Sequence, residues 1–150
     1  MRVLVQRVQE ARVEVAGEVV GSCEGGLLLL VGLGAGDGPR EVAWMAHKVA
    51  GLRIFSDSDG QMNRSIIDTG GDILAVSQFT LYGDCKKGRR PSFVEALKPG
   101  EAEPLFESFI DQLGVEGVSR VEEGRFGASM QVHLINDGPV TLWIEREASE

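Results

Sequence analysis

A segment of mixed polar and aromatic residues, SQFTLYG at 77–83, carries the side chains best suited to line a small binding pocket. It follows the apolar run ILAV, so we expect a buried strand to end near Ser77. Ser77, Gln78 and Thr80 supply hydroxyl and amide groups, and Phe79 places an aromatic ring among them. This combination at a strand end predicts a pocket. The alternative is a half-buried strand that turns its polar face to solvent.

A cluster of cations follows at 86–90, in the sequence KKGRR. Lys86, Lys87, Arg89 and Arg90 surround a glycine, an arrangement that suits the phosphates of a nucleic acid. The chain as a whole has a net charge of −8, which argues against broad, non-specific binding of nucleic acid. The cluster is therefore either a local phosphate-binding loop or a solvated charged loop.

The stretch QVHLINDGPVTLWIE, residues 131–145, alternates like a strand on both sides of an Asn-Asp-Gly-Pro segment. Asp-Gly is a common hairpin sequence. The proline that follows removes a backbone donor where a second strand should begin. Gly138 and Pro139 therefore form either a plain turn or a rigid feature directed at another group.

Conventional catalytic groups are scarce in this sequence. His47 and His133 are the only histidines, and neither has a ligand at a recognised metal-binding spacing, so no metal site is predicted. No Gly-x-Ser-x-Gly motif of a serine hydrolase is present. The glycine-rich turn at 32–38 lacks the spacing of a dinucleotide fingerprint, and Asp37 would repel a pyrophosphate. A flexible connector explains this turn, and no cofactor is predicted.

The elements that must position these residues are those of one α+β domain spanning residues 1–150. We expect mixed or antiparallel, barrel-like sheets packed against two main helices. The helices are expected after Pro39 and around 105–113, where apolar residues recur at helical spacing, with Gly114 ending the second helix. The run at 26–33 predicts a strand buried on both faces. Other strands are expected at 2–23 with a turn near Gly17, and at 52–55, 72–77, 118–122, 129–135 and 140–146.

Bulk properties are those of an ordinary soluble protein, with 43% hydrophobic and 25% charged residues. No apolar run reaches the ~18 residues that a membrane span needs. The charged, alternating N-terminal stretch does not resemble a signal peptide. Two cysteines are too few for a disulfide framework. We expect a cytoplasmic protein without a membrane partner.

Taken together, the segments SQFTLYG, KKGRRPSF, GRFGASMQV and NDGPVT resemble the D-aminoacyl-tRNA deacylase family. VQRV near the start and LRIFSDSDGQMN resemble it too, so the similarity runs from Met1 to about Ile144. The main departures are GLGAGDG, at a connector that varies in the family, and the C-terminal REASE. Several long motifs in the same order make this resemblance specific.

The resemblance implies a homodimeric enzyme that hydrolyses the ester between a D-amino acid and the 3′ end of tRNA. It implies that Gly138-Pro139 is a cis dipeptide that enters the active site of the partner subunit, and that Ser77, Gln78, Phe79 and Thr80 line that site. We expect the dipeptide to exclude L-amino acids sterically, since their side chains would meet its carbonyl groups. Glycine has no side chain to exclude, so glycyl-tRNA should also be cleaved.

The scarcity of acid–base groups fits this implied reaction, because an aminoacyl ester is already activated and lies beside a ribose hydroxyl. Backbone N–H groups near Gln78 and Phe79 are expected to stabilise the oxyanion. We expect Thr80 to orient water or substrate, with a nucleophilic role as the alternative. Lys86, Lys87, Arg89 and Arg90 are then expected to contact tRNA phosphates.

Two other functions fit parts of the sequence. A non-catalytic RNA-binding module would use the basic loop and aromatic residues such as Phe79 and Phe93 for stacking. A nucleotide-dependent enzyme would use the glycine-rich turn at 32–38.

Overall fold

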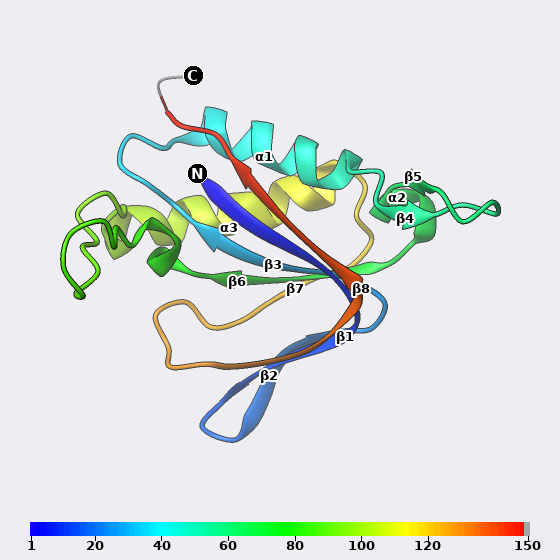
Figure 1. The fold of residues 1–150 in the computed structure, drawn as a ribbon, viewed down its shortest axis with the longest axis horizontal. Helices are drawn as coiled ribbons and strands as arrows, with labels where there is room; N and C mark the ends of the chain where they lie inside the picture. The colour runs from blue at the N-terminus through cyan, green and yellow to red at the C-terminus, as the bar shows by residue number, and fades with distance from the viewer. Residues whose placement is uncertain (149–150) are drawn as a thin grey trace.

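A long first strand organises the fold of the computed structural model, which describes residues 1–148 (Figure 1). The strands are β1 (Arg2–Val15), β2 (Glu18–Cys23), β3 (Gly26–Gly32), β4 (Phe55–Ser56), β5 (Met62–Arg64), β6 (Asp72–Ser77), β7 (Val121–Glu123) and β8 (Gln131–Glu145). The helices are α1 (Pro39–Gly51), α2 (Ile66–Thr69), the single 3-10 turn η1 (Phe79–Tyr82) and α3 (Pro99–Val115).

The main sheet is mixed and curls toward a barrel. β1 pairs antiparallel with β2, β3 and β8, whereas β3 and β6, and then β6 and β7, are parallel. The backbone N–H of Ser22 in β2 donates to the Glu122 carboxylate in β7 at 2.9 Å, which draws the two outer strands together. This arrangement confirms the predicted single α+β domain with a barrel-like sheet.

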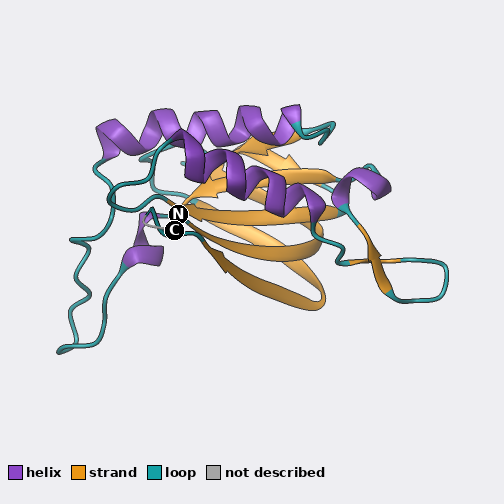
Figure 2. Cartoon of the chain, turned by 90° about the horizontal axis from the view of Figure 1, so that it is seen from above, coloured by secondary structure: helices purple, strands orange, loops and turns teal. Residues whose placement is uncertain are grey.

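Two apolar layers explain the uninterrupted hydrophobic run of β3. Leu27, Leu29 and Val31 face the core shared with α1 and α3, whereas Leu28 faces a second core inside the curled sheet. Figure 2 shows the two long helices side by side over the sheet. Both faces of β3 are therefore buried, as its composition predicts. Among residues 1–148, no helix is long and apolar enough to cross a membrane.

Several predicted boundaries are wrong in detail. The strand expected at 52–55 is reduced to β4, which pairs with the unpredicted β5. Helix α2 was also missed, although Ser65 and Asp68 form a capping box at its start. Helix α3 continues one residue beyond Gly114, and β7 begins at Val121 rather than at 118.

The region around Gly138 and Pro139 is not a hairpin. The predicted strands at 129–135 and 140–146 are one strand, β8, which continues alongside β1. Between the pairs Val8–Asn136 and Gln6–Thr141, β8 has more residues than β1, so 137–140 bulges out of the ladder. The chain keeps its direction through this segment.

Candidate active site

The predicted pocket residues lie where β6 passes into η1. Ser77 is the last residue of β6, and Phe79 and Thr80 begin the 3-10 turn. The backbone N–H of Gln78 donates to the Val31 carbonyl at 2.7 Å, so this junction is tied to the end of β3. The Gln78 N–H is therefore not available for an oxyanion, which corrects one expectation and leaves the Phe79 N–H as the candidate donor.

Side chains at the junction form two local contacts. The side-chain amide of Gln78 donates to the hydroxyl oxygen of Thr80. The ring of Phe79 meets the ring of Phe93 edge to face, with centroids 5.2 Å apart. Phe79 keeps 57% of its surface exposed, far more than a ring of its size keeps in a core. An exposed aromatic pair beside hydroxyl and amide groups can stack on a planar ligand and orient its polar atoms.

A cavity of about 640 Å³ opens beside this junction. The residues Ser77, Gln78 and Phe79 line it. Thr80 does not line the cavity, but its hydroxyl oxygen accepts a hydrogen bond from the side chain of Gln78, which does. The rest of the lining is mainly apolar and comes from distant segments: Val31, Leu33, Val76, Phe93, Ala96, Leu97, Lys98, Pro99, Ala102, Phe106, Phe126, Gly127, Ala128, Met130 and Val132. Its size and mixed lining suit a small organic ligand.

Sequence reasoning missed most of this lining. Phe126 and Met130 belong to the GRFGASMQV motif that supports the family resemblance, but nothing in their spacing indicates a cavity. Lys98 precedes α3 and is the one ionisable side chain among the described residues that line the cavity. The available clue to its position was Pro99, which follows Lys98 directly and is a residue favoured at the first position of a helix.

The four predicted phosphate-binding residues lie together on one projecting loop. Mutual backbone hydrogen bonds of 2.8 and 2.9 Å between Asp84 and Ser92 close its base. All four cationic side chains, Lys86, Lys87, Arg89 and Arg90, are exposed. Within the described chain, none of them has a carboxylate at ion-pair distance. Phe93, which follows the base of the loop directly, lines the cavity, so the end of the loop adjoins the cavity.

Gly138 and Pro139 lie away from the cavity of their own chain. The peptide bond between them is cis, and both residues are exposed. Arg7 holds this bulge, because its Nε donates to the Asp137 carbonyl at 3.0 Å and its Nη1 to the Ile54 carbonyl at 2.6 Å. Arg7 pairs with Leu27 at the start of β3, whereas the pocket lies at the end of that strand. One chain therefore does not bring the dipeptide and the pocket together.

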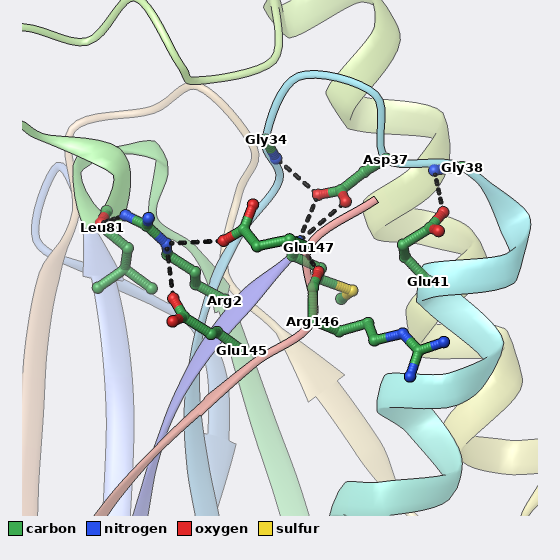
Figure 3. A network of polar contacts seen from close by, with 10 residues as sticks. Arg2, Gly34, Asp37, Gly38, Glu41, Leu81, Glu145, Arg146 and Glu147 are labelled. Carbon is green, nitrogen blue, oxygen red and sulfur yellow. Dashed lines mark hydrogen bonds and ion pairs between the residues drawn. The ribbon is translucent and has the colours of Figure 1, made fainter. Parts of the chain in front are cut away.

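The glycine-rich turn at 32–38 is used for packing (Figure 3). The α-ammonium group of Met1 lies 2.8 Å from the Asp37 carboxylate, which also accepts from the Gly34 N–H at 2.7 Å. The Gly38 N–H, at the start of α1, donates to Glu41 at 2.9 Å. These carboxylates occupy the backbone donors that a nucleotide phosphate would need, which removes the support for nucleotide binding here.

Burial raises the pKa values of two groups, one in η1 and one in the second core. Burial first, and then the nearby Asp37 carboxylate, raise the pKa of the Tyr82 phenol well above its usual value. The Cys23 thiol, inside the second core, has its pKa raised by burial to about 11 and stays protonated at neutral pH. In residues 1–148, no cluster of three or more His, Cys, Asp or Glu side chains is placed to hold a metal ion.

Comparison with known proteins gives one family. The model of the family described as D-Tyr-tRNA(Tyr) deacylase matches residues 4–145. A protein of Brevibacillus brevis named D-aminoacyl-tRNA deacylase is 59% identical to the chain, over 97% of this chain and 99% of the relative.

Two solved structures share the fold. One, titled c-Myc DNA Unwinding Element Binding Protein, superposes with a TM-score of 0.93 at 39% identity and covers 99% of this chain and 100% of its own. The other, titled as a probable eukaryotic D-amino acid tRNA deacylase, superposes with a TM-score of 0.81 at 19% identity, covering 95% and 97%. At that identity the second likeness establishes the fold alone.

Proposed function

Because the chain belongs to the D-Tyr-tRNA(Tyr) deacylase family, we propose that it hydrolyses the ester bond of D-aminoacyl-tRNA and releases the free D-amino acid and tRNA. The enzyme is a hydrolase that acts on ester bonds. The observation that carries the proposal is the junction of β6 and η1, where polar groups meet an exposed aromatic pair at a cavity beside a loop of unpaired cations. A tRNA 3′ end offers matching groups: phosphates, a planar base and an activated ester.

In the proposed complex, the basic loop binds phosphates of the acceptor end and the cavity receives the terminal aminoacylated nucleotide. The Phe79 N–H faces the developing oxyanion. Ser77, Gln78 and Thr80 hold the ester, the ribose hydroxyl and a water molecule in the reactive geometry. The apolar lining excludes bulk water, which strengthens these polar contacts. The reaction uses no cofactor and no metal, and takes place in the cytoplasm.

The proposed selectivity for D-amino acids depends on a homodimer. Gly138 and Pro139 lie far along the sheet from the pocket of their own chain, are exposed, and are held in place by Arg7, so a partner subunit can receive them. Their carbonyl groups would clash with the side chain of an L-amino acid, and would accept hydrogen bonds from the α-amino group of a D-amino acid. Glycyl-tRNA, which carries no side chain, is also a substrate.

A turnover assay tests the proposal directly. Purified protein is incubated with D-tyrosyl-, L-tyrosyl- and glycyl-tRNA, and release of the amino acid is followed over time. We expect D-tyrosyl- and glycyl-tRNA to be cleaved and L-tyrosyl-tRNA to be spared. Binding of all three without cleavage would overturn the proposal in favour of a nucleic-acid-binding protein without catalytic activity.

A glycine variant tests the gate within the same assay. In Gly138→Ala, the new Cβ would lie 2.8 Å from Val140 Cγ2 and 3.3 Å from Arg7 Nη2, so the bulge must shift. The ratio of D- to L-tyrosyl-tRNA cleavage should therefore fall. Gly17→Ala is the matched control: Gly17 also has a positive φ of +81°, but its new Cβ would meet nothing within 4 Å. An unchanged ratio in Gly138→Ala would contradict the gate without contradicting the hydrolysis.

A further inference from the structure

Two segments that lie far apart in the sequence meet around one arginine. The glycine-rich turn at 32–38 and the C-terminal segment that includes Glu147 both lie beside Arg2, the first residue of β1 (Figure 3). None of these residues belongs to the motifs that suggest deacylation. Their shared position next to η1 raises the question of what the arrangement does.

The backbone of Arg2 is fixed on both sides. Its Cα is paired with Gly32 of β3 and with Glu145 of β8. Gly32 itself packs against η1, since a Cβ on it would lie 3.1 Å from the Leu81 Cβ. The start of β1 therefore lies directly beside the turn that carries the candidate catalytic residues.

The Arg2 side chain contacts the far end of that turn. Its Nη1 donates to the Leu81 carbonyl at 3.0 Å, and its guanidinium carbon lies 4.2 Å from the centroid of the Tyr82 ring. Nε lies 3.2 Å from Glu145 and 3.6 Å from Glu147. The two glutamates are 45% and 42% exposed, so these ion pairs contribute little stability and act mainly to orient the guanidinium.

The 3-10 turn is thus anchored to the rest of the fold at its two ends, whereas its middle has only the local contacts to Phe93 and Gln78. At the first end, the Gln78 N–H is bound to the Val31 carbonyl. At the other end, the Tyr82 ring packs on Gly34, where a Cβ would lie only 2.4 Å from ring atoms, and Arg2 binds the adjacent carbonyl. Phe79 and Thr80, between these anchors, are exposed. Their position depends on the anchors, because a single turn has little stability of its own.

We propose that Arg2 is a positioning residue of the active site, which fixes the Phe79–Thr80 turn through the Leu81 carbonyl and the Tyr82 ring and is itself oriented by Glu145 and Glu147. This inference rests on the proposed deacylase function. Arg2 acts through η1 and does not touch the substrate. Removing it should therefore impair the chemical step more than the binding of tRNA, which the basic loop provides.

The first test compares steady-state kinetics of Arg2→Met and Arg2→Lys on D-tyrosyl-tRNA. Since small displacements of reacting groups are costly, we expect Arg2→Met to lower kcat at least about tenfold with KM changed less than about twofold. Arg2→Lys retains a donor for Leu81 but not the planar stacking on Tyr82, so it should lie between wild type and Arg2→Met. Arg12→Met is the matched control, because Arg12 lies on the same strand and pairs with Glu14 at 3.1 Å, beside β2.

The second test does not depend on activity. Hydrogen exchange of the peptide 77–84 reports on the bonds from Leu81 N–H to Gln78 and from Gly83 N–H to Thr80. Exchange there should accelerate in Arg2→Met, and to a smaller degree in Glu145→Gln/Glu147→Gln, but not in Arg12→Met. Should Arg2→Met be too unstable to purify, Arg2→Lys and the double glutamine variant carry both measurements.

The outcomes separate the two claims. Wild-type protein without deacylase activity overturns the proposed function, while the exchange data still decide whether Arg2 holds the turn. An unchanged rate of hydrogen exchange, or a rise in KM with kcat unchanged, overturns the role of Arg2 and leaves the deacylase function standing. Faster exchange together with a selective loss in kcat supports it.

Discussion

The hydrogen bond between Gln78 and Thr80 limits what Thr80 can do. The Thr80 hydroxyl oxygen accepts from the Gln78 amide, so its own proton is directed elsewhere and can be donated to substrate or water. A nucleophilic threonine needs a base to accept that proton. Among the described residues that line the cavity, the one ionisable side chain is Lys98, and neither a histidine nor a carboxylate is present to act as that base. Orientation of substrate or water is therefore the role that this geometry favours.

Replacement of Thr80 by Val separates the two roles. If Thr80 orients the reactants, loss of its hydrogen bond should lower kcat by about fivefold, since one hydrogen bond contributes about 1 kcal/mol. Thr80→Ser keeps the hydroxyl and should retain most activity, which makes it the control for side-chain size. Single-turnover rates measure the chemical step. Complete loss in Thr80→Val, with no residual turnover, would identify Thr80 as the nucleophile instead.

At the scale of elements, the sequence predicts what depends on local periodicity. Alternation in β1, the apolar run of β3 and the helical spacing in α1 all reflect burial of one or two faces. The spacing of apolar residues in the sequence shows which faces these are. The single-turn elements α2 and η1 were not predicted, because each is too short for a helical period to repeat. The division of β8 into two strands was wrong, because the Asn-Asp-Gly-Pro segment interrupts the alternation of residues, whereas the chain pairs with β1 on both sides of the bulge.

Part of the candidate site could be suggested from the sequence because it is local. Residues 77–80 are contiguous, so their composition suggested a pocket, with a half-buried strand as the alternative. The cavity wall combines β3, α3 and the segment around Phe126, which only the tertiary fold brings together. The contacts of Arg2 and Arg7 could not be predicted at all, since each side chain donates a hydrogen bond to a carbonyl that is distant in sequence.

The basic loop offers a test at this scale. If its cations contact tRNA phosphates, neutralising Lys86 and Lys87 together to Gln should reduce the slope of log binding constant against log salt by about 1 per lysine. Nitrocellulose filter binding of a non-hydrolysable aminoacyl-tRNA analogue at several salt concentrations gives that slope. Lys48→Gln, on the exposed side of α1, is the control for lowered charge without the loop. Equal slopes in all three proteins would mean that the loop is merely solvated.

At the scale of the whole molecule, one acidic group sets part of the pH dependence of stability. The Glu123 carboxyl in β7 has its pKa raised to about 7, first by burial and then by a hydrogen bond and charge repulsion from Glu107, with Asp111 adding to the repulsion. Both neighbours lie on α3, so the packing of this helix against β7 includes three carboxylates. The folded state therefore favours the protonated form of Glu123.

The consequence is a stability that falls as pH rises from about 4.5 to about 7, because in this window the folded protein binds more protons at Glu123 than the unfolded chain does. Replacing Glu123 by Gln, which mimics the protonated carboxyl, should raise stability slightly at pH 5 and by more at pH 8. Urea denaturation at the two pH values measures the difference, and Glu103→Gln, exposed on α3, should change stability little at either. A gain in Glu123→Gln that is the same at both pH values would contradict the assignment, since a constant difference reflects packing rather than a proton.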